Sequence, residues 1–459
     1  GEGPMCKKAA GAAVHQPAEV SPAVVMSGKN FDATVLSPED SWIEGLDHEA
    51  FKADIRALGK ELHAQQGPAD VAHLNKIILW QRLSMVVGFA TMWYCINPVS
   101  IYLLSLGCMT RWAIVAHHIC HGGFDKCSGG KYNRFKFGVG SLYRRCADWL
   151  DWMLVEAWNV EHNQLHHYHL GEEADPDLVE LNLKYLRNAP FHVAFKYAFV
   201  FFFTATWKWF YYAPNTLKML KLHEIRRRGQ VPKYKNGKLM TSRRLNTPCV
   251  ATHVGVFFSA WDLFGQVLGP FFVRNFVLIP GIAGLLLGRS AWFNSIASML
   301  LAEGLTNIHS FLNIVTNHTG DDLYRFDTSC EPRSATFYLR QVISSANFTT
   351  GEPGTFVGDF NDFTHGWLNY QIEHHLWPDL SMLSYQKAAP LVRAICRKHN
   401  VPYIQQNVLW RLKKTIDIMV GHTSMRRYPS KWEHAPDLAA AQEAVEGQPT
   451  EQKISAGAN

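Results

Sequence analysis

The sequence predicts an all-α integral membrane protein: two transmembrane helical hairpins with a cytoplasmic-side helical cap that holds a His-rich di-metal site. Three observations predict this fold. Apolar stretches occur in two pairs, apolar residues make up 47% and charged residues 18% of the 459 residues, and many of the 22 histidines lie beside the stretches. A helix needs about 20 apolar residues to cross a hydrocarbon core of roughly 30 Å. Aromatic residues, at 13%, suit side chains that lie at membrane interfaces.

The first apolar pair is Ile77–Ile96 and Val99–Ala116, separated by the turn-forming Asn97-Pro98. The second pair is Asn275–Gly288 and Ser290–Gly320, in which Glu303 is the one acidic or basic residue between Ser290 and Gly320. Each pair is long enough for two membrane crossings and predicts a helical hairpin.

Two further stretches, 190–214 and 250–273, are apolar but interrupted by Lys196, Lys208 and Asp262. The histidine clusters precede and follow both stretches. If the clusters share one site, an even number of crossings separates them. We expect that neither stretch crosses and that 190–214 lies in the membrane interface.

Around these spans we divide the chain into five segments. They are an N-terminal tail (1–40), an amphipathic N-terminal helix region (41–76), a membrane domain (77–400), a C-terminal cap extension (401–435) and a flexible tail (436–459). In the second segment, Trp42, Phe51, Ile55, Leu58 and Leu62 recur at helical spacing, which predicts a packed amphipathic helix.

The nine scattered cysteines include no Cys-x-x-Cys, which argues against a disulfide framework and an iron–sulfur centre and favours a reducing compartment. The net charge of +6 is mild and accompanies no nucleic-acid motif, so we expect no nucleic-acid partner. Basic residues crowd the segments next to the histidines, which predicts that this face is cytoplasmic or equivalent.

The histidines form a constellation of three clusters and one further residue. His117 and His121 are four residues apart, as are His162 and His166, and a helix brings such pairs onto one face. The eight candidate ligands are His117, His121, His162, His166, His167, His318, His374 and His375. One tetrahedral ion takes four ligands, so eight imidazoles predict two metal ions. Spacing alone does not choose between iron, copper and zinc.

Several polar residues beside the clusters are candidates for orienting the imidazoles or for binding the metal. The carboxylates of Glu161, Asp175, Asp177 and Glu373 suit acceptance of an outer ring N–H. For each of them, an ordinary solvated carboxylate is the alternative. For the histidines the alternative is a set of hydrogen-bonded core residues, which is costly for eight imidazoles without a shared ligand.

The motifs His-x-x-x-His, His-x-x-x-His-His and Gln-x-x-His-His-Leu-Trp-Pro resemble the three histidine boxes of the membrane fatty acid desaturase superfamily. The resemblance spans about residues 75–400. It implies two Fe ions held by the boxes, use of O2, and removal of hydrogen from a lipid acyl chain. It also implies that His318 is an additional ligand and that Asn313 or Asn317 supports a water on one iron.

The sequence departs from the family pattern at two positions. Gln371 stands where many members have His, as in front-end desaturases, and His118 stands where Asp or Glu is common. Front-end members often carry a fused cytochrome b5 domain, but the sequence has no His-Pro-Gly-Gly haem motif. His169, His309 and His365 fall outside the pattern, and we expect hydrogen bonding or packing for them.

No Gly-x-Gly-x-x-Gly dinucleotide motif follows a strand, so we expect an external electron donor, cytochrome b5 or a ferredoxin. Basic patches suited to an acidic carrier or to anionic lipid headgroups occur at Arg144–Arg145, Arg226–Arg228 and Arg243–Arg244. The expected location is the endoplasmic reticulum or a plastid or mitochondrial membrane, with the histidines on the cytosolic, stromal or matrix side.

Three other functions stay open at this point. A hydroxylase or ketolase on the same scaffold would act on an acyl chain, a sphingolipid or a carotenoid. A non-catalytic subunit would keep the fold within a membrane complex. A zinc-dependent membrane hydrolase would work without O2. Metal analysis separates an iron enzyme from the last two.

Overall fold

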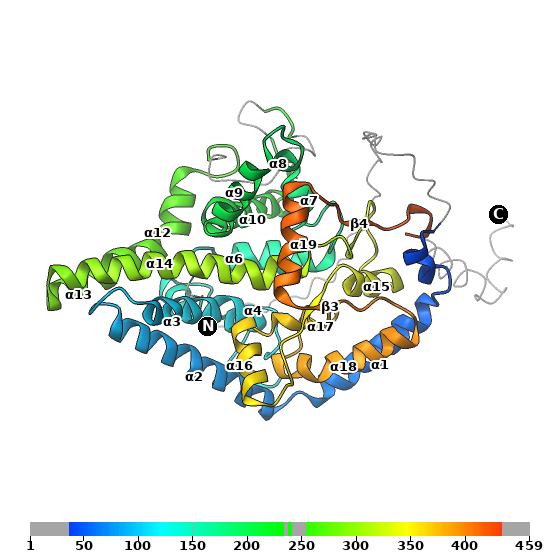
Figure 1. Cartoon of the computed structure of the whole chain (residues 1–459), viewed down its shortest axis with the longest axis horizontal. Helices are drawn as coiled ribbons and strands as arrows, with labels where there is room; N and C mark the ends of the chain where they lie inside the picture. Colours follow the sequence, from blue (N-terminus) through cyan, green and yellow to red (C-terminus); the bar gives the residue numbers. More distant parts are fainter. Residues whose placement is uncertain (1–35, 150, 234–236, 241–253, 434–459) are drawn as a thin grey trace, which may run out of the picture.

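The structure, a computed structural model, describes residues 36–149, 151–233, 237–240 and 254–433. The expected tails therefore lie outside the described residues, except for residues 36–40, and so do Arg243 and Arg244. Helices dominate the described part and confirm the helical class (Figure 1). The strands have two residues each and form two parallel pairs. β1 (Tyr324–Arg325) pairs with β4 (Arg426–Arg427), and β2 (Asn347–Phe348) pairs with β3 (Gln405–Gln406).

The first apolar pair forms α2 (Pro68–Thr91) and α3 (Pro98–Met109), which pack against each other. Asn97 begins α3 because its side chain accepts a hydrogen bond from the backbone N–H of Ser100, 2.8 Å away. Glycines allow the close approach of the two helices. A Cβ added at Gly88 would lie 2.8 Å from Leu104 Cγ, and one at Gly107 would lie 2.4 Å from Met85 Sδ. Helix α2 begins nine residues before the apolar stretch, at Pro68.

The second pair corrects the expected division of the chain. Residues 261–273 are not separate from the stretch that begins at Asn275, because one helix runs from Trp261 to Leu287. This helix alternates π-helical segments, η8 (Trp261–Leu268) and η9 (Val273–Leu278), with α12 (Gly269–Phe272) and α13 (Ile279–Leu287). Gly288, with φ +93°, turns the chain into α14 (Arg289–Ile314), which packs against α13 and α3.

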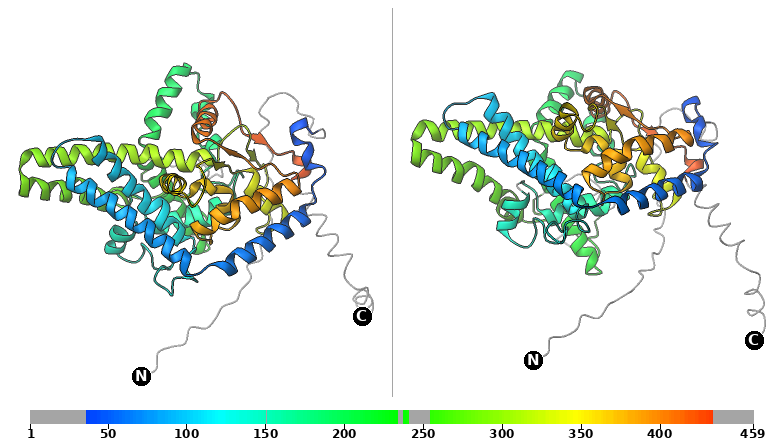
Figure 2. Two further views of the ribbon diagram at one scale, coloured as in Figure 1. Left: turned by 60° about the horizontal axis from the view of Figure 1, so that its bottom comes forward. Right: turned by 90° about the horizontal axis from the view of Figure 1, so that it is seen from below.

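Two helices of the described residues are long and apolar enough to cross a membrane, Pro98–Cys120 and Trp261–Leu287. The stretch 190–214 contains a shorter apolar helix, α9 (Val193–Thr204), and the π-helical segment η6 (Lys208–Tyr212). Figure 1 shows α2, α3, α13 and α14 extending together to one side of the molecule, and Figure 2 shows the same arrangement from two other directions.

Helices α1, α15, α17, α18 and α19 gather at the other end of the molecule (Figure 1). The expected amphipathic helix is α1 (His48–Gln65), which buries Phe51, Ile55, Leu58 and Leu62. It packs against α15 (Ala335–Ile343) and α18 (Met382–Lys398). The other cap helices are α4 (His117–Cys120), α6 (Val155–Trp158), α10 (Ala213–Arg227), α16 (Phe356–His365), α17 (Gln371–Leu376) and α19 (Val408–Val420).

A buried ion cluster fixes η6 against α14. Lys208 Nζ lies 2.8 Å from an Asp151 oxygen and 3.3 Å from Glu303 Oε1, and all three side chains are at most 4% exposed. Glu303 also accepts a hydrogen bond from Trp152 Nε1 at 2.6 Å. The acidic residue in the expected fourth span is therefore neutralised by a lysine from the stretch 190–214.

One predicted basic patch is not available at the surface. Arg145 is buried, and its guanidinium donates to the backbone carbonyls of Trp152 and Val267. Arg144 remains exposed, as do Arg226–Arg228 at the end of α10.

Candidate metal centre

The first histidine pair sits at the end of the long helix that begins at Pro98. The segment η2 (Thr110–Ala116) is π-helical, with the N–H of His117 bonded to the carbonyl of Trp112, five residues earlier. Helix α4 follows it, and His121 N donates to the carbonyl of His117 at 3.0 Å. The α-helical turn puts the two imidazoles on one face, with ring centroids 4.9 Å apart.

The second cluster begins in another π-helical segment, η4 (Asn159–Leu165), which contains His162, and continues in the 3-10 helix η5 (His166–Tyr168), which contains His166 and His167. The N–H of His166 is bonded to the carbonyls of Glu161 and His162. A π turn closes i to i+5 rather than i+4, so residues four and five positions after His162 both return toward it. The rings of His166 and His167 lie 5.2 and 4.8 Å from that of His162. We expected an α-helical pair here, and the wider turn explains how a third imidazole joins it.

The third cluster is placed by a tight turn between α16 and α17. Gly366 and Trp367 both adopt positive φ, +72° and +53°, a conformation that is costly for tryptophan. A Cβ at Gly366 would meet Ile114 Cγ1 at 2.9 Å, so glycine is needed there. The buried Asp362 stabilises this turn. Its carboxylate accepts hydrogen bonds from Thr350 (2.8 Å), Asn369 (2.7 Å), Tyr370 (3.0 Å) and Gln386 (2.6 Å).

These segments, with His318 after α14, bring the eight histidines together in two groups. Ligand atoms of each group lie within 4.8 Å of one another: one group is His117, His121, His162 and His374, and the other is His166, His318 and His375. His167 lies between them. Its Nε2 is 3.3 Å from Nε2 of His162, and its ring stacks on His375 at 4.3 Å.

The nitrogens are arranged as a bound cation requires. Nε2 of His117 faces Nε2 of His374 at 3.0 Å, and Nε2 of His375 faces Nε2 of His318 at 3.4 Å. In each pair one nitrogen can carry a proton and donate it to the other, so at least one nitrogen of the pair presents a lone pair. Among the described residues, His121 Nε2 is buried with no hydrogen-bond partner. Unpaired buried polar atoms cost about 1–3 kcal/mol each, so ions that accept these lone pairs would remove the penalty. The residues fit two metal ions.

The protonation states also favour metal binding. Burial, followed by the neighbouring imidazoles, holds the pKa values of His162, His167 and His375 well below the ordinary range. Neutral imidazoles are the form that binds metals. Burial also acts to lower the pKa of His166, but Asp175 outweighs it and the pKa is raised. His166 Nδ1 donates to Asp175 Oδ1 at 2.9 Å, which turns Nε2 toward the cluster.

Replacing Asp175 with asparagine tests this orienting role. The Asp175→Asn variant is expected to bind metal about 10- to 100-fold more weakly, because an imidazole loses the carboxylate that fixes its tautomer. Metal titration of the purified protein with a competing chelator measures the change. Asp54→Asn is the matched control, since it removes a carboxylate 2.7 Å from His399, a histidine that belongs to neither group. Equal affinities in both variants and the unaltered chain would contradict the role.

Of the three amide side chains next to the cluster, Gln371 and Asn317 lie beside His318, whereas Asn313 bonds elsewhere. Gln371 Nε2 lies 3.0 Å from His318 Nε2, and Asn317 donates to Gln371 Oε1 at 3.2 Å. Asn313 is turned elsewhere. Its hydrogen bonds among the described residues go to the Thr364 carbonyl and to Met109. The expectation that Asn313 or Asn317 supports a bound water stays a prediction.

His118 and Glu373 are buried and bond to residues outside the cluster, whereas both side-chain oxygens of the buried Glu161 have no hydrogen-bond partner among the described residues. His118 Nδ1 donates to the Ile114 carbonyl at 2.7 Å and belongs to neither group. Glu373 accepts from Asn347 and Tyr403, both at 2.8 Å. Burial, followed by Asp177, raises the pKa of the enclosed Glu161 well above its usual range. A carboxylate oxygen of Asp177 and one ring nitrogen each of His162 and His166 lie within 4.8 Å of one another.

The three histidines outside the pattern make hydrogen bonds away from the cluster. His169 Nδ1 donates to Glu172 at 2.8 Å, His309 Nε2 to the Thr364 carbonyl at 2.6 Å, and His365 Nδ1 to the Asn361 carbonyl at 2.8 Å. None of the three belongs to a metal-sized group within the described part of the chain.

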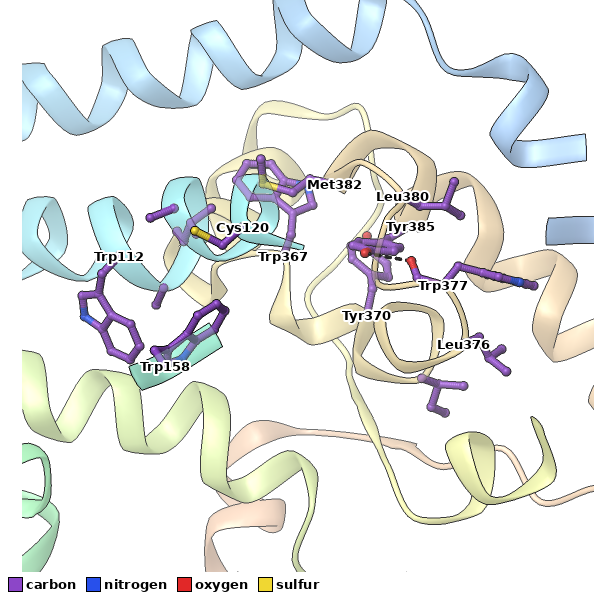
Figure 3. Close-up of a cluster of buried hydrophobic side chains, with 14 of the residues drawn as sticks. Trp112, Cys120, Trp158, Trp367, Tyr370, Leu376, Trp377, Leu380, Met382 and Tyr385 are labelled. Atoms are coloured by element: carbon purple, nitrogen blue, oxygen red, sulfur yellow. Dashed lines mark hydrogen bonds between the residues drawn. The ribbon is translucent and has the colours of Figure 1, made fainter. Parts of the chain in front are cut away.

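Two aromatic residues support the imidazoles and were not predicted from the sequence. Trp158 stacks on His162 at 4.5 Å with an interplanar angle of 22°. The two are four residues apart, so helical spacing could have revealed the pair. The hydroxyl of Tyr385 lies 3.3 Å from His374 Nδ1. It donates to the Trp377 carbonyl at 3.1 Å, and Figure 3 shows these two residues. Tyr385 comes from α18, and no local spacing signals its contact.

Comparison with known proteins gives a consistent result. The family model described as fatty acid desaturase matches residues 91–407. The NADPH-dependent stearoyl-CoA 9-desaturase of Mycobacterium tuberculosis is 30% identical over 145 residues, 31% of this chain and 32% of that protein. The fatty acid desaturase 2-like protein of Mus musculus is 42% identical over 76 residues, 17% of this chain and 14% of that protein. Fatty acid desaturase 3 of Bos taurus is 46% identical over 52 residues, 11% of each. The chain thus spans a third or less of these relatives' lengths. No solved structure matches the chain.

Proposed function

The chain belongs to the fatty acid desaturase family, and from that premise we propose that it is a membrane di-iron enzyme that introduces a double bond into a fatty acyl chain with O2. The observation that carries the proposal is the pair of imidazole groups that share His167 as a neighbour. The names of the relatives, stearoyl-CoA and fatty acid desaturases, support an acyl substrate, in a lipid or a thioester.

The eight histidines His117, His121, His162, His166, His167, His318, His374 and His375 would hold the two ions. Bound iron would supply the redox chemistry in which O2, two external electrons, two protons from solvent and two hydrogens of a CH2–CH2 unit end as two waters and a CH=CH unit. The protein's own residues orient the imidazoles and exclude water. Asp175 keeps a proton on His166 Nδ1, Tyr385 and Trp158 fix their imidazoles, and the cluster's burial keeps bulk water away.

We further propose that α2 with the helix Pro98–Cys120, and the helix Trp261–Leu287 with α14, are the two membrane hairpins, and that the histidine cap faces the cytosol, stroma or matrix. Exposed apolar residues on these helices support the placement, among them Leu83, Leu285, Leu286 and Leu300. Helix α9 spans 12 residues, about 18 Å, which is shorter than a hydrocarbon core. Its exposed Phe195, Phe201 and Phe202 suit a helix lying in the interface. Residues 77–400 would then form the membrane desaturase domain.

The two electrons would come from a separate carrier, cytochrome b5 or a ferredoxin. The exposed Arg226–Arg228 at the end of α10 offer a positive surface to such an acidic protein. The organelle would be the endoplasmic reticulum, a plastid or a mitochondrion.

Lipid profiling of cells that express the protein tests the function. We expect a fatty acid with one additional double bond, located by mass spectrometry, because the family's chemistry acts on acyl C–H bonds. Cells that express His375→Ala should lack this product. A hydroxylated or keto product with no new double bond would contradict desaturation and favour the hydroxylase alternative.

A further inference from the structure

A basic pocket lies beside α2, and none of its lining residues is a histidine. Its cavity volume is about 410 Å³. Asn75, Ile78, Leu79 and Arg82 of α2 form one wall, with the spacing of a single helix face. The opposite wall is Arg111, Lys131, Tyr132, Phe137, Arg144 and Asp148.

The pocket carries an excess of positive charge. Four cationic side chains, Arg82, Arg111, Lys131 and Arg144, line it, against the single carboxylate of Asp148 among the lining residues. Asp148 is already engaged, because it accepts from the backbone N–H of Gly138 at 3.2 Å and lies 3.9 Å from Arg111. Arg82 and Lys131 form no ion pair with any described residue. An anion is therefore the chemically matched ligand.

Hydrogen bonds hold the pocket open without a ligand. The hydroxyl of Tyr132 donates to Asn75 Oδ1 at 2.7 Å and ties the loop after α4 to α2. The guanidinium of Arg111 donates from Nε to the carbonyl of Ala147 at 3.0 Å and lies over the ring of Phe137. These contacts pre-organise the cationic wall, which lowers the cost of binding.

The surroundings of the pocket are apolar rather than solvated. Leu79, Leu83 and Val86 follow one another on the same face of α2 and are 55%, 53% and 62% exposed. This Leu79–Val86 stripe starts in the pocket and runs along α2 away from it over about 10 Å. Phe135 and Leu142 on the facing loop are also exposed, at 77% and 62%. A ligand that is anionic at one end and apolar along its length fits both features.

We propose that this pocket binds the phosphate headgroup of an anionic membrane phospholipid, whose acyl chain lies along the Leu79–Val86 stripe. Basic pockets beside membrane helices are suited to such headgroups. A soluble phosphate compound would use the cations but would leave the stripe uncovered, and a cavity of this size is too small to receive the face of a carrier protein. The site goes beyond the proposed function, because it shares no residue with the candidate metal centre.

The test compares lipid binding by the full-length protein and the double variant Arg82→Gln/Lys131→Gln. Both proteins are purified in neutral detergent, and phosphatidylglycerol, phosphatidylcholine or soluble glycerol phosphate is titrated and followed by native mass spectrometry. The unaltered protein should prefer phosphatidylglycerol. The double variant should bind it roughly 30-fold more weakly, because each basic residue near an anionic lipid contributes about fivefold.

The matched control is Arg56→Gln/Lys60→Gln, which removes two exposed charges from α1 and should bind phosphatidylglycerol as the unaltered protein does. Metal content is measured on every sample. A folding defect lowers the metal content of the variant alone, and a failure of the desaturase proposal lowers it in every sample, so both are distinguished from a loss of lipid binding. Two results would overturn the proposal: equal phosphatidylglycerol binding by both double variants, and glycerol phosphate binding as tightly as the lipid.

Discussion

Replacing His375 or His166 with alanine is expected to remove at least one metal ion and abolish turnover. Both belong to the group completed by His318. That group offers three imidazoles, so losing one leaves two nitrogens for its ion. Both side chains are at most 1% exposed, so each truncation leaves a buried position without its ligand nitrogen. Elemental analysis of the purified variants and an assay of the acyl product measure the two effects.

His365→Ala is the matched control for these variants. His365 lies six residues before Gln371 in the same region, but its Nδ1 bonds to the Asn361 carbonyl and it belongs to neither group. The control should keep its metal and most of its activity. Retained iron and turnover in both His375→Ala and His166→Ala would refute the assignment of the ligands.

Replacing Lys208 with methionine is expected to lower the free energy of unfolding by about 3–5 kcal/mol, the range for breaking a buried ion cluster on one side. Methionine fills similar space but leaves Asp151 and Glu303 without their cation, and both are enclosed at 1% and 4% exposure. Thermal unfolding of the detergent-solubilised protein measures the change. The triple variant Lys208→Met/Asp151→Asn/Glu303→Gln should recover much of the loss, because it removes the unpaired charges together with the lysine.

Lys413→Met serves as the matched lysine control. Lys413 is 59% exposed and pairs with Asp417 four residues later, an arrangement that contributes less than about 1 kcal/mol. Similar unfolding temperatures for the two methionine variants would show that the Lys208 cluster contributes no more than a surface pair.

The sequence was sufficient for the parts of this protein that depend on local spacing. The amphipathic pattern of residues 41–66 predicted α1, and the spacing of His117 and His121 predicted that a helix turns both rings to one face. Both depend on which side chains share a helix face, and that is set by positions close in sequence.

The parts that were missed depend on contacts between distant segments or on small changes of helical geometry. The π turns at η2 and η4 cannot be distinguished from α turns by apolar periodicity. The continuous helix Trp261–Leu287 was divided at Arg274, because a charge inside an apolar run was read as its end. Lys208 belongs to the stretch 190–214, which we expected in the membrane interface, whereas Asp151 and Glu303, from two other segments, bind its side chain in the interior. Tyr385 and Asp362 support the third cluster through contacts that no motif encodes.

The most direct test of the central claim is the metal content of the purified full-length protein, measured by elemental analysis on the same sample as its activity. Two neighbouring imidazole groups that each bind one iron predict about two iron ions per chain, with activity that depends on O2 and falls as the iron is removed by a chelator. Zinc in place of iron with activity in the absence of O2, or a chain that binds no metal, would contradict the account.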